Sequence, residues 1–439
     1  MKQKSAREMQ KRLHELIPAG GHTYSKGDDQ FPEIAPGLMV KAKGAYCWDA
    51  DGNKFLDYGM GLRAVAVGHA NDEINEAVCK QIALGTNYTR PSLIELELAE
   101  TIVDLIPSVE MVKFAKNGSD VTSGAIRLAR AYTGKKFIAV CAEHPFYSFN
   151  DWFIGSTACN SGIPDEISSL TLKFNYNNLQ SVEDLFAKYS NQIAAFILEP
   201  AKAVEPAMFG DKNFLQKLKE LCDKNGSLLI LDEMISGFRF DLKGAQHIYN
   251  VDPHLTTFGK ATANGFSFAF LAGKKEIMEL GGIYHDKPRV FLLSGTHGAE
   301  STGLIAAIKN IEIFKRDNVV KHHWDYGKKF KDGINAIAKQ KGIDKNFAIT
   351  GFDCSPVVEA RNTEGAIDLS FLTLFSQEMI RGGVLIPWIA FSKSHSDEEL
   401  KITLEAAENA LTVYKVALEN GVQKSLIGNA VKPVFRKFN

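Results

Sequence analysis

Residues 228–234 read Leu-Leu-Ile-Leu-Asp-Glu-Met, a run of four apolar residues that leads into two acids. A short, fully apolar run of this kind is typical of a strand buried on both faces of a parallel sheet. Ligands of open α/β sheets bind beyond the carboxyl ends of the strands, which is where Asp232 falls. A carboxylate there can bind a metal or a protonated ring nitrogen, or it can simply cap a following helix. This fragment alone leaves these readings open.

Similar apolar runs alternate with helical stretches from about residue 71 onward, which predicts an α/β fold with a mostly parallel sheet. The other runs are residues 111–114, 137–140, 194–198, 268–272 and 290–293. In the last third, the pattern predicts helices at 300–317, 319–341 and 397–419, with strand-like pieces at 347–350, 357–360 and 384–386. This part therefore predicts a smaller α+β domain.

The N-terminal part has a different character. Residues 1–15 are charged and polar, so they predict an amphipathic helix rather than a signal sequence. Residues 38–58 alternate apolar and polar side chains around Asp51-Gly52-Asn53, which predicts two strands joined by a tight turn. A small N-terminal sheet is expected.

Composition excludes several classes of function. The chain has 439 residues and a formal net charge of -1, so neither a nucleic-acid nor a membrane-surface partner is indicated. It contains no apolar run long enough to span a bilayer. Its six cysteines form no CxxC pair, which predicts reduced thiols and a cytoplasmic location. Its eleven histidines show no metal-ligand spacing, so no metal site is expected.

Two further segments carry chemistry without being distinctive. Lys260 ends an extended piece and is followed by small residues, which leave room for a planar ligand. A desolvated lysine can act as a nucleophile, although most lysines lie on the surface. Asn117-Gly118-Ser119 lie between a strand and a helix, where free amides can bind phosphate. The same three residues are also compatible with an ordinary helix cap.

Taken together, these segments resemble class III aminotransferases of the pyridoxal 5'-phosphate (PLP) fold type I, in the glutamate-1-semialdehyde aminomutase-like branch. The resemblance covers nearly the whole chain from Ile17 and rests on residues 231–239, 244–249 and 255–260, in matching order and spacing. It implies an α/β large domain with a mostly parallel seven-stranded sheet flanked by helices. It also implies a small α+β domain built from both ends of the chain. The implied division is 1–70, 71–315 and 316–439.

The resemblance implies roles for the cofactor residues. Lys260 corresponds to the lysine that forms the Schiff base with PLP, and Asp232 to the partner of its pyridinium nitrogen. Gly118 and Ser119 correspond to the phosphate cradle, with Asn117 and Glu199 among the other implied cofactor-binding residues. Thr296 corresponds to a threonine that reaches the phosphate across a dimer interface. An obligate homodimer with shared sites is therefore implied.

Three cofactor positions depart from the family pattern. Phe146 takes the place of the tyrosine, and Tyr147 that of the histidine, in the usual Tyr-His-Gly segment. A ring at this point still predicts stacking on the pyridine, although a plain core aromatic pair is the alternative. Met234 lies where valine is commoner and is expected to pack on the opposite ring face.

The substrate-binding positions also depart from the family. The aminomutase has an arginine near its N-terminus that binds the substrate carboxylate. In this chain Gly27 falls at that position, with Lys26 beside it. A lysine does not bind a carboxylate in the same bidentate way as an arginine. Arg63 is a candidate replacement, or else a solvent-facing arginine. His297 and Glu300, with Tyr147, predict a polar pocket for a sugar-like or phosphorylated carbonyl substrate.

The sequence therefore predicts a PLP-dependent transaminase. Its amino donor would be an amino acid, glutamate by default, and Lys260 would serve a ping-pong mechanism that delivers the amino group to a carbonyl acceptor. The alternatives are an intramolecular aminomutase of the glutamate-1-semialdehyde type, or a decarboxylase or epimerase on the same scaffold. A non-catalytic binding protein is disfavoured because Lys260, Asp232 and Thr296 are all present.

Overall fold

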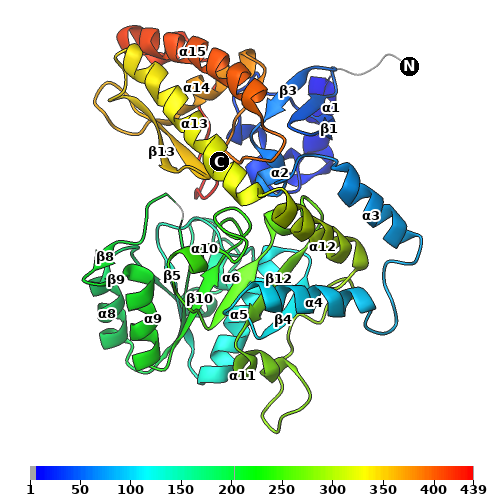
Figure 1. Ribbon diagram of the computed structural model, residues 1–439. Helices are drawn as coiled ribbons and strands as arrows, with labels where there is room; N and C mark the ends of the chain where they lie inside the picture. The colour runs from blue at the N-terminus through cyan, green and yellow to red at the C-terminus, as the bar shows by residue number, and fades with distance from the viewer. Residues whose placement is uncertain (1–5, 202, 439) are drawn as a thin grey trace. The chain divides into compact units, whose positions relative to one another are not determined.

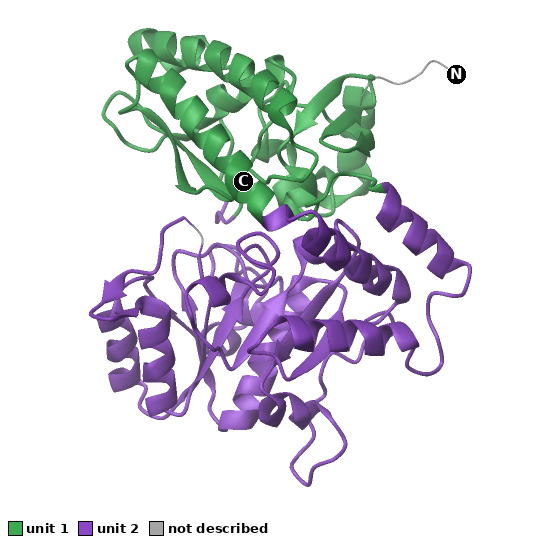
Figure 2. Ribbon diagram, viewed as in Figure 1, with its two compact units in different colours: residues 1–71, 321–434 green, residues 72–320, 435–439 purple. Residues whose placement is uncertain are grey.

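The computed structural model describes residues 6–201 and 203–438 (Figure 1). The chain divides into two compact units (Figure 2). Unit 1 comprises residues 1–71 and 321–434, and unit 2 comprises residues 72–320 and 435–439. These limits lie within a few residues of the division at 70 and 315 drawn from the sequence. The last residues differ, since they group with unit 2 rather than with the small domain.

Unit 2 is built around a seven-stranded sheet in the order β4-β12-β11-β10-β7-β5-β6. Neighbouring strands run parallel except at β12, which is antiparallel to both β11 and β4. The predicted mostly parallel sheet is confirmed. The strands are β4 (Met111–Ala115), β12 (Ala269–Gly273), β11 (Leu255–Phe258), β10 (Leu228–Asp232), β7 (Ile193–Leu198), β5 (Phe137–Cys141) and β6 (Thr171–Phe174).

Helices bury both faces of this sheet, which explains why its central strands are apolar throughout. On β10, Leu228 and Ile230 belong to the apolar cluster that includes residues of helix α5 (Gly118–Thr133). Leu229 and Leu231 point the opposite way, into a cluster with α8 (Leu179–Lys188) and α9 (Phe214–Lys224). A strand covered on both faces has no side that can remain polar.

The prediction of a strand at 290–293 is wrong. These residues form a loop in which the Val290 amide donates to the carbonyl of Leu280 at 2.8 Å. Val290 and Leu292 are buried against the α5 side of the core, so their apolar character reflects loop packing. Strand β6 was not predicted, because only its last residue is fully buried.

The other helices of unit 2 surround the sheet. The longer ones are α3 (Asp72–Ile82), α4 (Leu93–Leu105) and α12 (Ser301–Arg316), of which α12 confirms the helix predicted at 300–317. The short ones are α6 (Asp151–Ile154), α7 (Asp165–Ser168), α10 (Ala245–Ile248), α11 (Lys275–Met278), η4 (Lys260–Ala263) and η5 (Glu279–Gly281). A small hairpin joins β8 (Met208–Phe209) to β9 (Lys212–Asn213).

Unit 1 contains a four-stranded sheet in the order β1-β2-β3-β15. Its strands are β1 (Met39–Lys43), β2 (Tyr46–Asp49), β3 (Lys54–Asp57) and β15 (Val384–Leu385). The segment 38–58 therefore holds three strands rather than the predicted two, because the chain also turns at Gly44, where φ is +59°. A separate pair joins β13 (Phe347–Phe352) to β14 (Ser355–Ala360).

Long helices complete unit 1. They are α1 (Ala6–Leu16), α13 (Val319–Gln340), α14 (Leu369–Arg381) and α15 (Asp397–Asn420), and α13 and α15 confirm the helices predicted at 319–341 and 397–419. The short elements are α2 (Met60–Arg63), η1 (Pro18–Gly20), η2 (Tyr24–Lys26), η3 (Asp28–Gln30) and η6 (Val422–Lys424). Residues 1–5 of the predicted N-terminal helix lie outside the described residues. None of the helices in the described part is both long and apolar enough to cross a bilayer.

Candidate active site

Asp232 is the last residue of β10 and is only 2% exposed. Its Oδ1 accepts hydrogen bonds from the Met234 amide and from Thr257 Oγ1 on the neighbouring strand, both at 3.1 Å. Burial, and after it the charge of Glu199, raise the pKa of this carboxyl from 3.8 to about 7, against the opposing charge of Lys260. Asp232, Glu199 and Lys260, three of the predicted site residues, therefore lie close enough for their charges to interact.

Glu199 follows β7, the strand beside β10, so the parallel sheet delivers both acids to one edge. It is buried, and its amide donates to Nδ1 of His144 at 3.1 Å. The same Nδ1 lies 2.9 Å from the hydroxyl of Tyr147. The sequence did not single out His144, because a lone buried histidine carries no spacing signal.

Lys260 follows the end of β11 after one intervening residue, Gly259. A Cβ built on Gly259 would lie 2.7 Å from the sulfur of Met234, so any larger residue there would displace the Met234 side chain. The same sulfur would lie 3.0 Å from a Cβ on Gly118. Met234 thus packs between the start of α5 and the residue that precedes Lys260.

Asn117 is the N-cap of α5, and its side chain accepts from the Asp120 amide at 3.0 Å. Gly118 and Ser119 are the first two helical residues, whose amides have no acceptor within the helix. The hydroxyl of Ser119 accepts from the amide of Phe149 at 3.0 Å, which ties the loop after β5 to the helix start. This arrangement offers amides to an anion.

Tyr147 is buried, and its carbonyl accepts from Thr122 Oγ1 on α5 at 2.9 Å. Burial raises the pKa of its phenol well above the ordinary value, and the charges of Cys141, Glu199 and Asp232 add to that effect. The tyrosine hydroxyl therefore stays protonated beside the buried acids.

Phe146 lies in a different environment, with 46% of its surface exposed. Its ring meets Phe153 edge-on at a centroid distance of 6.0 Å. It also stacks on Phe435 from the C-terminal tail at 6.4 Å, with 24° between the planes. Phe435 was not predicted from the sequence, because it lies far along the chain from the loop that it contacts.

The loop before α12 carries the remaining predicted residues of unit 2. Thr296 and His297 are exposed, and the carbonyl of Thr296 accepts from Asn87 at 3.3 Å. Glu300 is the N-cap of α12, where its carboxylate accepts from the Thr302 amide at 3.0 Å and pairs with Lys116 at 2.8 Å. Both of its oxygens thus have partners within the chain.

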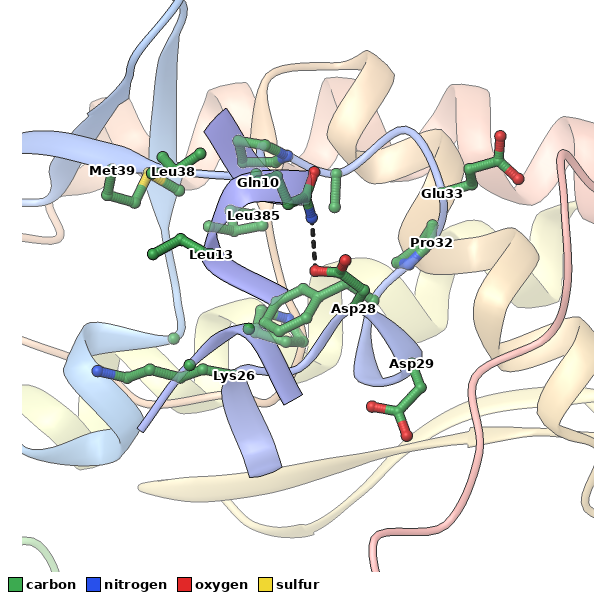
Figure 3. Close-up of a pocket in the computed structure, with 18 of the residues that line it drawn as sticks. Gln10, Leu13, Lys26, Asp28, Asp29, Pro32, Glu33, Leu38, Met39 and Leu385 are labelled. Atoms are coloured by element: carbon green, nitrogen blue, oxygen red, sulfur yellow. Dashed lines mark hydrogen bonds between the residues drawn. The ribbon is translucent and has the colours of Figure 1, made fainter. Parts of the chain in front are cut away.

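Lys26 belongs to unit 1 and lines a cavity of about 830 Å³. All the residues that line this cavity lie in unit 1, among them Gly59, Gly61 and Trp388. Figure 3 shows Lys26 at the cavity, with a hydrogen bond between Gln10 and Asp28. None of the predicted cofactor residues lines it.

Arg63, also in unit 1, ends a turn in which every residue of α2 has a positive φ, namely +42°, +61°, +65° and +67° from Met60 to Arg63. Such a conformation is strained for any residue except glycine. Asp57 secures the turn, because its Oδ1 accepts from the amides of Gly59 at 2.7 Å and Met60 at 3.2 Å. Trp388 donates to the Gly59 carbonyl at 3.1 Å.

The family described as class III aminotransferase matches residues 26–354 of this chain. A glutamate-1-semialdehyde 2,1-aminomutase of Persephonella marina is 34% identical over 400 residues, which are 86% of this chain and 91% of that protein. The enzyme of the same name from Francisella philomiragia is 33% identical over 415 residues, or 89% and 94% of the two chains.

Solved structures share the whole fold. The PLP internal aldimine form of the FumI protein of Sphingopyxis sp. superposes with a TM-score of 0.85 at 26% identity, covering 94% of this chain and 97% of that one. A glutamate-1-semialdehyde aminomutase of Pseudomonas aeruginosa gives 0.79 at 17% identity and covers 93% and 94%. This chain therefore belongs to the class III aminotransferases, the PLP-dependent family of fold type I that its sequence predicted.

Proposed function

We propose that the strand ends of unit 2 hold the PLP cofactor, with Lys260 as the residue that binds it covalently and Asp232 as the partner of its ring nitrogen. The observation that carries this proposal is the environment of Asp232. Its carboxyl is buried beside a second acid, Glu199, and burial together with the charge of that acid raises its pKa to about 7. A protonated ring nitrogen would supply the positive charge that favours the ionised carboxylate.

The other residues also fit the cofactor. The amides of Gly118 and Ser119 at the start of α5 would bind its phosphate. Met234, between Gly118 and Gly259, would pack on one face of the ring, with Phe146 and Tyr147 expected on the other. Asn117 caps the helix and so fixes the two amides.

Each of these residues has a task in the reaction. PLP, when bound, withdraws electrons from the carbon that carries the amino group. The Lys260 amine would remove the proton from that carbon and return it to the carbon on the other side of the transferred nitrogen. Asp232 would keep the ring nitrogen charged, and the protonated hydroxyl of Tyr147 can donate a hydrogen bond to Nδ1 of His144, 2.9 Å away. Burial of the acids keeps water from competing with these contacts.

The relatives favour the intramolecular reaction, which was the alternative reading of the sequence. Their printed name is glutamate-1-semialdehyde 2,1-aminomutase, at 32–34% identity over most of both chains. An aminomutase that moves the amino group within one substrate is therefore the first candidate. It is an isomerase, whereas the main prediction from the sequence was a transaminase.

A transaminase is the second candidate, and the N-terminal segment favours it. Gly27 falls where the resemblance implies an arginine for the substrate carboxylate, and the neighbouring Lys26 lacks a planar guanidinium. The exposed His297 would then contact a different carbonyl substrate. In this proposal Glu300 does not contact the substrate. Its ion pair with Lys116 instead holds the loop that carries His297.

Two assays on the purified PLP-loaded protein separate these candidates. The first supplies glutamate-1-semialdehyde alone and follows its isomerisation. The second supplies glutamate with a panel of keto-sugars and other hydroxylated carbonyl compounds, and follows release of 2-oxoglutarate. Isomerisation without keto-acid release supports the aminomutase, and keto-acid release with an acceptor supports the transaminase. Lys260→Ala serves as the blank, with a loss of at least about a hundredfold in either assay.

We also propose a homodimer with shared sites. Thr296 is exposed in the single chain, as expected of a residue that would complete the phosphate site of a second subunit. Several large apolar side chains of unit 2 are also exposed, among them Leu84, Leu93 and Phe291. A subunit interface would remove such apolar side chains from water.

A further inference from the structure

The backbone of Lys260 is strained. Lys260 begins the short turn η4 and has a φ of +38°, in the left-handed region that only glycine adopts without steric cost. The preceding residue is crowded as well, because Gly259 lies against the sulfur of Met234. A strained backbone of this kind persists only where its surroundings impose it.

One set of contacts lies within the turn. The amide and the hydroxyl of Thr262 both donate to the carbonyl of Gly259, at 3.0 and 2.8 Å. These bonds give the turn its shape, but they move with it. They do not fix the turn relative to the sheet.

Asn310 supplies an anchor from outside the turn. It lies on α12 and is fully buried, and its Nδ2 donates to the carbonyls of Ala261 at 2.9 Å and Thr262 at 2.8 Å. Both hydrogens of the amide are thus used on consecutive residues of the turn. The orientation of the amide follows from chemistry, because a carbonyl oxygen can only accept.

The oxygen of the same amide indicates that Asn310 does not mainly stabilise the fold. Asn310 Oδ1 is buried without a hydrogen-bond partner among the described residues. A buried polar atom in that state costs free energy, whereas a leucine of similar size would not incur this cost. The two donated bonds are therefore what distinguishes asparagine from an apolar residue at this position.

We propose that Asn310 is a positioning residue for Lys260: its amide holds the Ala261 and Thr262 carbonyls and so fixes the turn from which the lysine amine reaches the cofactor. This inference rests on the proposed role of Lys260. A small displacement of a reacting group lowers the rate strongly while leaving binding nearly intact. Loss of the amide should therefore act on kcat more than on KM.

The test compares Asn310→Leu with Asn310→Asp and a matched control, Ile311→Val. The control removes a buried methyl group from the next residue of α12 and leaves the amide in place. For each PLP-loaded protein, the measurements are the thermal midpoint, the pH midpoint of the cofactor absorbance, and kcat and KM with the substrate found for the wild type.

We expect Asn310→Leu to fold, to shift the pH midpoint of the absorbance and to lower kcat by about tenfold or more, with KM changed by less than about threefold. A buried aspartic acid is protonated and can donate to one of the two carbonyls, so Asn310→Asp should fall between Asn310→Leu and the wild type. Ile311→Val should lower only the thermal midpoint.

The proposal is overturned if Asn310→Leu lowers the thermal midpoint but keeps the wild-type absorbance midpoint and kcat. If Asn310→Leu does not fold, an Asn310→Asp protein with wild-type absorbance and kcat overturns it equally. Failure of the proposed function gives a different result. In that case, borohydride reduction of the wild type followed by peptide mass analysis would find no cofactor on Lys260.

Discussion

Two aspartates in this molecule end a β-strand in the same local geometry, yet their surroundings differ. Asp57 ends β3 in unit 1, and Asp232 ends β10 in unit 2. In each, Oδ1 accepts a hydrogen bond from the amide two residues later, at 2.7 Å for Asp57 and 3.1 Å for Asp232. By local pattern alone, the two would be assigned the same role.

The groups that surround Asp57 and Asp232 give the two carboxylates different roles. The second oxygen of Asp57 meets Nε2 of His69 at 2.9 Å, so its carboxylate is bonded on both sides. Asp232 is instead buried near another acid, Glu199, which disfavours its charged form. Asp57 holds the strained turn at Met60–Arg63, whereas Asp232 is suited to a cationic ligand. The role of an aspartate at a strand end is thus determined by the charged groups that the fold places near it.

The largest expected effect is on turnover and belongs to Asp232. Asp232→Asn keeps the shape and the amide contact but removes the charge, so turnover should fall by about a hundredfold or more. The measurement is kcat of the PLP-loaded protein. Asp223→Asn is the control, since Asp223 pairs with Lys219 on the exposed face of α9 and should keep wild-type turnover. Near-normal turnover in Asp232→Asn would show that the charge of Asp232 is not needed for the reaction, and so that its role does not differ from that of Asp57.

The second expected effect is on stability and belongs to Asp57. Asp57→Ala leaves the amides of Gly59 and Met60 without their acceptor, so the free energy of unfolding should fall by about 1–3 kcal/mol. Urea unfolding followed by tryptophan fluorescence measures this change. Asp57→Asn keeps an oxygen acceptor and should lose less. Equal stability of Asp57→Ala and the wild type would show that the turn does not depend on Asp57.

The third expected effect is a pH dependence of stability that comes from Asp232. Because its pKa is raised from 3.8 to about 7, the folded cofactor-free protein holds a proton that the unfolded chain releases. This contribution to stability is present below about pH 4 and is lost as the pH rises through about 7. The stability of the wild type relative to Asp232→Asn should therefore decrease between pH 5 and pH 8, as measured by urea midpoints. A constant difference would contradict the raised pKa.

Much of unit 2 was predictable because its signals are local. A strand buried on both faces must be apolar along its length, so residues 228–231 predicted β10 correctly. The same reasoning failed at 290–293, since a loop that packs on α5 also needs apolar side chains. An apolar run predicts that a segment is buried, but it does not predict whether that segment is a strand or a loop.

Some site features had no signal in the sequence. The positive φ of Lys260 and the left-handed turn at Met60–Arg63 involve non-glycine residues, whose identity gives no warning of such a backbone. Asn310 and Phe435 lie far along the chain from the turn and the loop that they contact. Hydrogen bonds and ring contacts across such separations form only once the sheet and its helices are assembled.

By itself, the sequence determined the family, a mostly parallel sheet and the order in which Ser119, Asp232, Lys260 and Thr296 follow one another. These depend on local periodicity and on motif spacing, which are present in the unfolded chain. Only the tertiary structure decided that Asp232 lies beside Glu199 while Asp57 lies beside His69. The ionisation of a buried carboxyl depends on the charges around it, and folding alone brings those charges together.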